Sequence, residues 1–556
     1  MIDDISSGGV RLVPLGGLGD IGRNMMVVET ADDLVIVDAG IMFPPEEALG
    51  VDLIIQDISY LRERASKLRA YLITHGHEDH IGGLAYLLPE LPAPVYATRL
   101  AQGLVSVKLK DAGVKGIELV TINSDSTSDF GSIQAEYFPV AHSIPDAVGI
   151  ALRTPAGLLI HTGDFKIDHT PVMSDPTDLP RLAAYGREGV RVLMSDSTYA
   201  DHPGHTPSEQ VVGDALAQIM FSAPGRVIIA TFASQIARLQ QIVDGADAAG
   251  RTVFVTGRSM VNNVKMAKEL GYITSDGGGI RNISKHGGFA DEDVVIVCTG
   301  AQGEPMSALS RMAIGDHRDV RIKPGDTVVL SSSPIPGNES AVNRTINNLF
   351  RLDAEVRSVS GGDPNVHVHG HAAQEELKTV LSLTEPDIFV PVHGEFRHLA
   401  MHIGVAQSMG VPEEDCHLLL DGDVLDLTAE SHEVVGEVPA SYVYVDGMSV
   451  GGVDHTVLRD RRHLATEGMV VVVVPINHRT GQVEGQIDVV FRGFAGGQHS
   501  EALRDRTMEK VRETLQGENH PVEWTVIHET LKSSVSQFLY RETRQRPMVL
   551  PVAVEV

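Results

Sequence analysis

The string His-Gly-His-Glu-Asp-His at positions 75–80 limits what this chain can fold into more than any other part of its sequence. It comes directly after the apolar segment 70–74, which predicts a buried strand that ends at the first histidine. His75 and His77 are two positions apart, so their side chains share one side of an extended loop. The Asp79-His80 pair that follows points toward a second metal ion. Imidazole and carboxylate groups together suit zinc or manganese. A solvated histidine-rich loop is the alternative, but a chance match at four fixed positions is rare. The string therefore predicts a strand end that binds two metal ions.

Composition narrows the class of protein. Cys298 and Cys416 are the only cysteines among 556 residues, which excludes a disulfide framework and a thiolate-rich zinc site. No apolar run approaches the roughly 18 residues needed to cross a bilayer, and the first residues do not resemble a signal peptide. We therefore expect a cytoplasmic protein that makes no use of a membrane.

The net charge bears on the substrate. The chain carries 45 basic and 74 acidic residues, which gives a formal charge of −29. Proteins that bind polyanions usually carry a basic footprint, so this balance taken alone argues against nucleic acid. Whole-chain charge hides local patches and bound divalent metals, however, and it cannot select a substrate. It predicts weak nonspecific affinity for nucleic acid and a salt-sensitive groove.

The pattern of an apolar strand followed by a polar loop recurs along the chain. Segments 27–30 and 34–37 predict a hairpin, and 52–68 predicts a helix before the strand that leads to the histidine string. Helical segments lie between many of the other strands, which favours an α/β fold with catalytic loops at strand ends. Those other strands are predicted at 158–160, 192–194, 227–230, 253–255, 294–297, 328–330 and 388–392.

Breaks in this pattern predict the domain boundaries. The segments 203–207 and 361–364, which contain proline and glycine, bracket a block with its own strands, and the histidine-bearing strand ends stop near residue 450. A separate C-terminal unit shows strands at 470–474 and 489–491 and a helix over about 499–516. We therefore predict a first domain in two parts (1–207 and 365–450), an insertion (208–364), a linker (451–465) and a small α+β C-terminal domain (466–556).

Further metal ligands are expected at other strand ends. His142, Asp164 and His393 each follow an apolar segment, as His75 does. Any one of them alone is more often a capped or solvated polar residue. Together they complete two sites of the catalytic kind, in which a coordination position stays open for water. We predict His75, His77 and His142 on one metal, Asp79, His80 and His393 on the other, Asp164 as a bridge between them, and Asp38 as a residue that orients ligands.

A glycine-rich segment suggests a different ligand. Gly-Leu-Gly-Asp-Ile-Gly at 17–22 satisfies the pattern of dinucleotide-binding loops, and Asp38 follows at a suitable distance. Such a loop needs a helix after the glycines, whereas 25–30 is strand-like and runs into a tight turn. The sequence therefore argues against NAD binding.

The order of these motifs resembles the metallo-β-lactamase superfamily, which implies a sandwich of two β-sheets flanked by helices and a dinuclear metal site. The 155 residues from 209 to 363 resemble the insertion of the β-CASP nucleases. Ser-Asp-Ser-Thr at 195–198 and Gly-His-Ala at 370–372 match the acidic and histidine motifs that flank it. The resemblance implies that Asp196 orients His371, that His371 protonates the leaving oxygen, and that Asp79 also belongs to the catalytic set.

Strings along nearly the whole chain are similar to the bacterial ribonuclease J family. They are Gly-Gly-Leu-Gly-Asp-Ile-Gly at 16–22, Thr-Gly-Asp-Phe-Lys at 162–166, Ala-Thr-Phe-Ala-Ser at 230–234, Gly-Arg-Ser-Met at 257–260 and Ser-Ser-Ser-Pro-Ile-Pro-Gly-Asn-Glu at 331–339.

The resemblance implies metal-dependent 5′→3′ exonuclease and endonuclease activity on single-stranded RNA, in mRNA decay and rRNA maturation, through a hydroxide activated by two metals. It implies Zn²⁺ first, with Mn²⁺ or Mg²⁺ as alternatives. It also implies a homodimer or homotetramer, with RNA-degradation or ribosome-associated proteins as candidate partners.

One departure from the family concerns the 5′ end of the RNA. The family reads His-x-Ser-Gly-His where this chain has His-Val-His-Gly-His at 367–371. In related enzymes the first histidine and the serine help to hold a 5′-monophosphate, with serines like those at 331–333. His369 would bind phosphate better when protonated, or it would fill the pocket and favour endonucleolytic cleavage. Candidate RNA contacts are His367, His369, Gly370, Ser331, Ser332, Ser333, Ser234 and Arg258, with Arg344 and Lys265 as further cations.

Other functions are weaker alternatives. A hydrolase of small esters or thioesters would use the same metals, but it needs neither the insertion nor the Asp196–His371 pair. A non-catalytic RNA-binding or assembly subunit typically loses metal ligands, and DNA as substrate is disfavoured because His393 stands where RNA-processing members carry histidine. The C-terminal domain shows no recognisable chemistry and serves either oligomerisation or partner binding.

Overall fold

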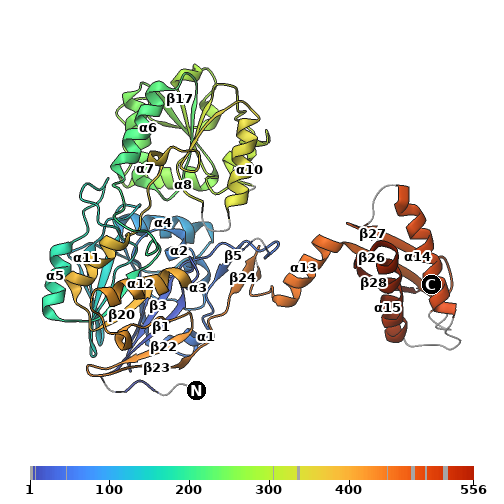
Figure 1. Ribbon diagram of the computed structural model, residues 1–556, viewed down its shortest axis with the longest axis horizontal. Coiled ribbons are helices and arrows are strands. Elements are labelled where there is room, and N and C mark those ends of the chain that lie inside the picture. Colours follow the sequence, from blue (N-terminus) through green and yellow to red (C-terminus); the bar gives the residue numbers. More distant parts are fainter. Residues whose placement is uncertain are drawn as a thin grey trace. The chain divides into compact units, whose positions relative to one another are not determined.

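Figure 1 shows the computed structural model, which describes residues 4–6, 8–45, 47–304, 306–334, 338–447, 449–477, 483–494, 498–516 and 524–555. The chain divides into two compact units, residues 1–43 with 53–443 and residues 44–52 with 444–556. The first unit contains a two-sheet sandwich and an inserted domain, and the second contains the C-terminal domain. Among the described residues, no helix is both long enough and apolar enough to span a bilayer.

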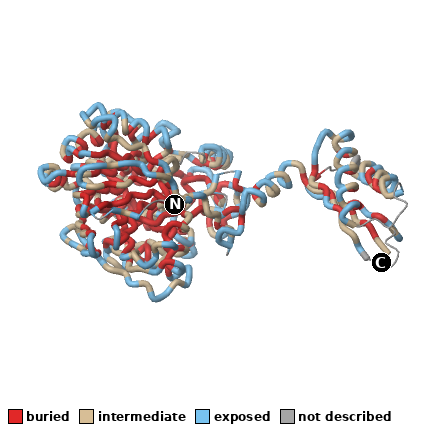
Figure 2. The backbone as a smooth tube through the Cα atoms, turned by 90° about the horizontal axis from the view of Figure 1, so that it is seen from below, coloured by how far each residue is buried: buried red, intermediate tan, exposed pale blue. Residues whose placement is uncertain are grey.

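The sandwich consists of two β-sheets whose facing sides share one hydrophobic core. Ile133, Ala135 and Tyr137 alternate into this core from one strand, and Leu12 and Val35 reach it from the other sheet. Figure 2 shows the buried residues gathered in the interior of the larger unit, with the exposed residues around them. The first sheet has the order β23 (His432–Glu437), β22 (Asp423–Leu427), β1 (Val10–Gly16), β3 (Met25–Glu29), β4 (Leu34–Val37), β6 (Leu68–Leu72), β7 (Val95–Thr98), β8 (Leu119–Ile122).

Helices cover the outer face of the second sheet. Its strands alternate between two cores, since Leu159 points to the inner core while Leu158 and Ile160 point to the outer one. Helices α5 (Leu179–Glu188), α11 (Gln374–Thr384) and α12 (Phe396–Ser408) contribute to that outer core, and α4 (Arg99–Asp111) packs on β7 and β8 of the first sheet. The layering confirms the predicted sandwich flanked by helices. The second sheet has the order β20 (Ile388–Val392), β13 (Val190–Asp196), β12 (Gly157–His161), β11 (Val148–Thr154), β10 (Ile133–Pro139), β9 (Thr127–Phe130).

Parallel strands bring polar side chains from distant parts of the chain together. Strands β12, β13 and β20 run parallel, and Asp164, Asp196 and His393 come at or just after their ends. In the other sheet β4 and β6 run parallel, and Asp38 and His75 follow their ends. Carboxyl ends of parallel strands are where open α/β sheets place their ligands.

The inserted domain is built on a wholly parallel sheet. Its central strands are continuous buried apolar runs, as a parallel sheet covered on both faces requires. Helices α6 (Gln210–Ser222), α7 (Ile236–Ala248), α8 (Arg258–Glu269), α9 (Ala308–Ala313) and α10 (Glu339–Phe350) belong to the same domain (Figure 1). The strand order is β16 (Ile280–Asn282), β15 (Thr252–Thr256), β17 (Val294–Cys298), β14 (Val227–Ala230), β18 (Thr327–Leu330), β19 (Glu355–Ser358).

The C-terminal domain has its own core. Val470 and Val472 alternate inward from the central strand, and Leu531, Val535 and Leu539 meet them at the four-residue spacing of a helix face. The elements are β27 (Asp488–Arg492), β26 (Met469–Ile476) and β28 (Met548–Glu555), with α14 (Gln498–Gln516) and α15 (Trp524–Thr543). The strands predicted at 470–474 and 489–491 and the helix predicted at 499–516 are confirmed. Helix α13 (His455–Glu467) overlaps the segment predicted as a linker.

The helix predicted over 52–68 is wrong in its first part and broken in the rest, where only residues 59–62 and 65–67 are helical. Residues Leu53–Ile55 form strand β5, and Ile54 pairs with Met42 in a β-bridge. The Asp57 carboxylate then accepts hydrogen bonds from Ser59, where a helix of four residues begins. A short apolar run does not distinguish strand from helix by its periodicity, and here pairing with a neighbouring segment decides.

Candidate active site

Close backbone packing fixes the loop that carries the histidine string. Helix α2 (Glu78–Ile81) begins within the string. The Ala39 amide, in the turn after β4, donates to the His80 carbonyl at 2.8 Å. A Cβ at Gly40 would lie 1.6 Å from the carbonyl oxygen of Asp79, so only glycine permits this approach. The string is thereby held against the end of the neighbouring strand.

Three histidines and one aspartate form a first cluster. His77 Nδ1 lies 3.0 Å from His75 Nε2 and 3.2 Å from His142 Nε2. Asp164 Oδ2 lies 3.6 Å from His75 Nε2 and 3.7 Å from His142 Nε2. Burial lowers the pKa of His75 and His142 well below the ordinary value and that of His77 to about 4. All three imidazoles are therefore neutral at pH 7, the form that binds a metal.

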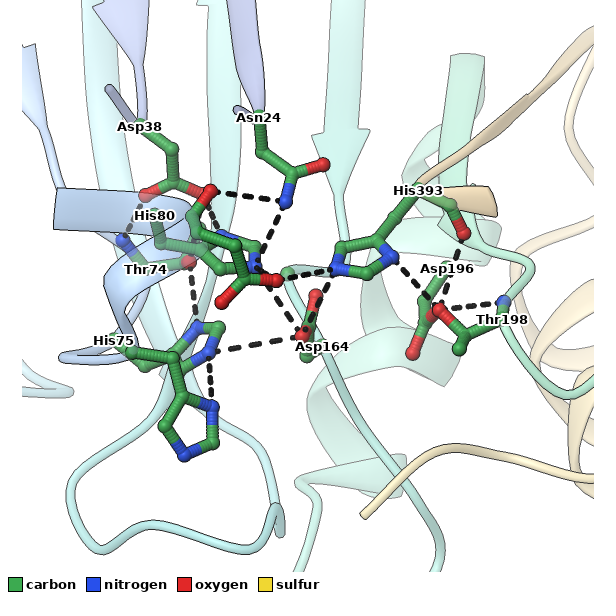
Figure 3. Close-up of polar contacts among 12 residues, drawn as sticks. Asn24, Asp38, Thr74, His75, His80, Asp164, Asp196, Thr198 and His393 are labelled. Carbon is green, nitrogen blue, oxygen red and sulfur yellow. Dashed lines mark hydrogen bonds and ion pairs between the residues drawn. The ribbon is translucent and has the colours of Figure 1, made fainter. Parts of the chain in front are cut away.

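A second cluster contains Asp79, His80 and His393 and shares Asp164 with the first (Figure 3). Asp164 Oδ2 lies 3.3 Å from His80 Nε2 and 3.4 Å from His393 Nε2. Asp79 Oδ2 lies 3.6 Å and 3.3 Å from the same two nitrogens. Burial opposes protonation of both histidines, but the carboxylates outweigh it, so the pKa of His80 is raised well above the ordinary value and that of His393 to about 9. A bound cation would displace these protons.

The donor atoms of the two clusters fit divalent metal ions. Each cluster combines imidazole nitrogen with carboxylate oxygen, and its ligand atoms all lie within 4.8 Å of one another. Cys298 is buried in the inserted domain, and no cysteine belongs to either cluster. This donor set suits zinc or manganese. The structure brings together all seven residues that the sequence predicts as metal ligands.

Neighbouring side chains orient two of these histidines (Figure 3). His80 Nδ1 donates to Asp38 Oδ2 at 2.7 Å. The amide and hydroxyl of Thr74 donate to the same carboxylate at 2.9 and 2.8 Å. Thr198 Oγ1 lies 2.7 Å from His393 Nδ1. Because both contacts engage Nδ1, Nε2 of each histidine is left for the cluster, which is the usual arrangement around a metal.

The buried Asp196 and the half-buried His371 form a pair beside the clusters. His371 Nδ1 donates to Asp196 Oδ2 at 2.7 Å and lies 4.0 Å from Asp164 Oδ2. The other oxygen of Asp196 accepts from the amide and hydroxyl of Thr198 at 3.0 and 2.8 Å. Burial opposes protonation of His371, but Asp196 outweighs it and raises the pKa of His371. A histidine whose pKa is raised holds its proton to higher pH, which suits it to general-acid work.

The three serines predicted to contact RNA differ in accessibility. Ser331 and Ser332 are buried, and their hydroxyls donate to main-chain carbonyls at 2.7 and 3.2 Å. Ser333 is half-buried, with its Oγ 3.4 Å from His369 Nε2. Of the three, only Ser333 therefore offers its hydroxyl next to another predicted RNA contact. Residues 335–337 of the same string lie outside the described residues.

The histidine segment 367–371 connects the metal clusters with the inserted domain. His367 Nδ1 accepts from Arg238 Nη1 of helix α7 at 2.9 Å, and the Gly370 carbonyl accepts from His142 Nδ1 at 2.8 Å. A Cβ at Gly370 would lie 2.7 Å from the His142 ring, so glycine lets this ligand approach. Burial lowers the pKa of His367 well below the ordinary value.

Four of the predicted RNA contacts belong to the inserted domain. Ser234 follows β14, and Arg258 begins α8 after β15. Arg258 is exposed, as are Arg344 and Lys265. Among the described residues, no hydrogen bond or ion pair links these four residues to the metal clusters. Their contact with RNA stays a prediction.

Two residues near the site escaped the sequence reasoning. Asn24 Nδ2 donates to the Asp79 carbonyl at 3.0 Å and lies 3.2 Å from His80 Nε2. Arg238 is buried and donates to both oxygens of Glu209, each at 2.8 Å. Asn24 belongs to no periodic pattern in the sequence that would have pointed to it. A lone arginine among the apolar residues of α7 is the one signal that could have revealed Arg238.

The layered sandwich, the shared-aspartate clusters at its strand ends and the inserted parallel-sheet domain define a metallo-hydrolase of the metallo-β-lactamase superfamily. Comparison with family models agrees. Residues 18–223 match the metallo-beta-lactamase superfamily, and residues 364–412 match the Zn-dependent metallo-hydrolase RNA specificity domain. The remaining matches are to the ribonuclease J beta-CASP domain at 224–349 and the ribonuclease J C-terminal domain at 456–556.

Full-length relatives narrow the class further. Ribonuclease J of Thermus thermophilus is 42% identical over 98% of this chain and 95% of its own length. Ribonuclease J 1 of Streptococcus pyogenes is 41% identical over 98% of this chain and 97% of its own length. Ribonuclease J2 of Bacillus subtilis is 38% identical over 98% of this chain and 99% of its own length. The chain belongs to the ribonuclease J family. A solved structure of an Enterococcus faecalis protein of unknown function shares the fold, with a TM-score of 0.52 over 75% of this chain and 100% of that one at 16% identity.

Proposed function

We propose that this chain hydrolyses phosphodiester bonds of single-stranded RNA with two divalent metal ions. His75, His77 and His142 would hold one ion, Asp79, His80 and His393 would hold the other, and Asp164 belongs to both clusters. The observation that carries the proposal is the position of Asp164 Oδ2, which lies 3.3 to 3.7 Å from Nε2 of four of these histidines. Zn²⁺ is the first choice of metal, with Mn²⁺ and Mg²⁺ as alternatives.

The chain's own residues would perform the proton transfer. Metal ions at these two positions supply a water nucleophile at neutral pH and offset negative charge on the phosphate. His371, whose pKa Asp196 raises, donates a proton to the departing 3′ oxygen and leaves a 5′-phosphate on the product. Asp38 and Thr198 keep the imidazoles of His80 and His393 in place through Nδ1.

RNA as substrate is supported by the family and by the position of the inserted domain. The relatives are named ribonuclease J. His367, four residues before His371, accepts a hydrogen bond from Arg238 of the inserted domain. A strand bound along this segment would therefore meet both domains. We propose 5′→3′ exonuclease and endonuclease modes, acting in mRNA decay and rRNA maturation in the cytoplasm.

The direct test is cleavage of end-labelled single-stranded RNA by the purified full-length chain in Mn²⁺ or Zn²⁺. We expect products that carry a 5′-phosphate, and loss of cleavage in the Asp164→Asn variant. A small thioester is the comparison substrate. Turnover of the thioester without cleavage of RNA would replace this proposal by a small-ester hydrolase.

Dependence on the 5′ end of the RNA is a finer part of the proposal. Burial and the neighbouring His371 lower the pKa of His369 to about 4, so His369 is uncharged at neutral pH and adds no positive charge for a 5′-monophosphate. This chain also lacks the serine that helps to hold a 5′-monophosphate in related enzymes. We therefore expect weaker discrimination among 5′-monophosphate, triphosphate and hydroxyl RNA than in the His369→Ser variant. Identical decay rates in the two proteins would refute this part.

Assembly into a homodimer or homotetramer is proposed for the C-terminal domain. The unit formed by 44–52 and 444–556 has a core whose buried residues all lie between Val470 and Val549, so removing 444–556 takes no residue from the core of the sandwich. Size-exclusion chromatography of the full chain and of a chain that ends at residue 443 is the test. Equal subunit numbers in the two would assign the domain to partner proteins instead.

A further inference from the structure

Three aromatic rings form a stack beside the candidate active site. The ring centroids of Tyr199 and His202 lie 3.6 Å apart with their planes at 9°. The centroids of Tyr199 and His369 lie 4.3 Å apart at 31°. Tyr199 and His202 belong to the loop after β13, and His369 belongs to the segment before α11. None of the three rings is in a metal cluster.

The two segments that form the stack also carry residues of the site. Tyr199 directly follows Thr198, whose hydroxyl contacts Nδ1 of His393. His369 comes two residues before His371, and an extended chain covers at most about 7 Å in two residues. A nucleotide next to the reacting phosphate would therefore reach these rings.

The outermost ring is accessible and held in place. The His202 side chain is 48% exposed, whereas Tyr199 and His369 are half-buried. His202 Nδ1 contacts Asp201 Oδ1 at 2.6 Å, and Asp201 Oδ2 accepts from Arg397 Nη1 at 2.9 Å. A ring already ordered in the free protein loses little entropy when a ligand stacks on it.

We propose that His202, Tyr199 and His369 form a stacking platform for one nucleobase of the bound RNA, with His202 as its open end. The inference rests on the proposed function, because it assumes that single-stranded RNA is the substrate. Stacking on aromatic rings is tolerant of sequence, since every base has a π-face.

Two further properties of the chain agree with stacking. Burial and the neighbouring His371 lower the pKa of His369 to about 4, so its ring is uncharged at neutral pH. The chain as a whole carries a formal charge of −29, so contacts to phosphate have little help from the overall field. A platform for bases provides affinity that does not depend on positive charge.

The test uses the full chain and RNA oligonucleotides of one sequence, each with a single abasic ribose at a different distance from the scissile bond. Loss of the base that occupies the platform should lower kcat/KM of the wild type about tenfold, within the roughly five- to 150-fold range that stacking contributes. His202→Ala should lower kcat/KM on intact RNA to a similar extent. It should also remove the abasic penalty at that position, because both changes delete the same contact.

Two variants serve as controls. His202→Phe keeps a ring that can stack and should restore both kcat/KM and the abasic penalty. His205→Ala removes an exposed histidine of the same loop that makes no ring contact among the described residues, and it should behave as the wild type. A flat abasic profile in the wild type, or a penalty that persists in His202→Ala, would overturn the platform.

Binding separates this inference from the proposed function. The dissociation constants of the same oligonucleotides are measured in EDTA by fluorescence anisotropy, where cleavage is not required. A position-specific abasic penalty on binding that His202→Ala removes, found in a chain that does not cleave RNA, would keep the platform and overturn the proposed function. Cleavage without any such penalty would do the reverse.

Discussion

Asp38 offers a sharp test of how the metal ligands are held, because it contacts a ligand without being in either cluster. Its carboxylate is buried and accepts from His80 Nδ1 at 2.7 Å, from the Thr74 hydroxyl at 2.8 Å and from the Thr74 amide at 2.9 Å. The residue adopts φ 61°, a left-handed conformation that asparagine tolerates as well as aspartate. Asp38→Asn therefore changes the hydrogen bonds and the charge and spares the backbone.

The magnitude follows from counting donors. Three donors face the carboxylate, and an amide presents one acceptor and one donor group in its place. At least one buried donor then loses its acceptor, which costs about 1–3 kcal/mol of unfolding free energy. The loss of the charge also lowers the basicity of His80, and such changes around a metal ligand typically reduce metal affinity about 10- to 100-fold. We expect both effects in Asp38→Asn.

The assay is competition with a chelator of known affinity, together with urea denaturation of the metal-free protein. Asp33→Asn is the matched control, since Asp33 is buried and accepts from Ser132 N at 2.7 Å, Ser132 Oγ at 2.8 Å and Arg69 Nε at 2.7 Å. It should lose comparable stability and keep wild-type metal affinity. Unchanged metal affinity in Asp38→Asn would refute the assignment of His80 as a ligand oriented by Asp38.

Three further predictions concern the proton donor, the domain core and the metals. Asp196→Asn removes the carboxylate that raises the pKa of His371, so burial then lowers that pKa. The acid form of His371 donates the proton and is lost as pH rises through the pKa, so the alkaline fall of kcat/KM should move to lower pH. An unmoved pH profile would contradict the role of the pair. Arg238→Met leaves the Glu209 carboxylate buried without its cation, and urea denaturation should show a loss of about 3–5 kcal/mol of unfolding free energy. A loss below about 1 kcal/mol would show that Glu209 finds another partner. Removal of metal by EDTA should lower the midpoint of thermal unfolding. Adding Mn²⁺ at about 100 times its Kd should restore about 2.7 kcal/mol of unfolding free energy. A midpoint that does not respond to metal would argue against the two clusters as metal sites.

The sequence predicted which residues meet in the two clusters because the segments that carry them follow buried apolar strands. His75, Asp164 and His393 are far apart in the chain, yet the rule that parallel strands end at one edge of a sheet brings them together. The same strand pattern predicted the inserted domain and the C-terminal domain. It failed at Leu53–Ile55, where a short apolar run fits a strand as well as a helix and pairing with another segment decides.

Contacts between side chains could not be predicted in this way. The rings of Tyr199 and His369 are 170 positions apart. They meet where the loop after β13 is hydrogen-bonded to the start of α11, since the Gln374 amide donates to the His202 carbonyl at 3.0 Å. Ser331 and Ser332 stand in a string that the family resemblance linked to phosphate, but their hydroxyls already donate to main-chain carbonyls. Burial and hydrogen-bond partners depend on the packed structure, and no spacing in the sequence records them.

We propose that this chain needs two metal ions to cleave RNA and that Asp164 contributes to both metal sites. The most direct test is a stoichiometric titration of the metal-free protein with Mn²⁺, at protein concentrations far above Kd, with cleavage of single-stranded RNA measured at each point. We predict that activity rises to a plateau at two equivalents per chain in the wild type and that the plateau is absent in Asp164→Asn. Full activity at one equivalent, or cleavage that needs no metal, would contradict the account.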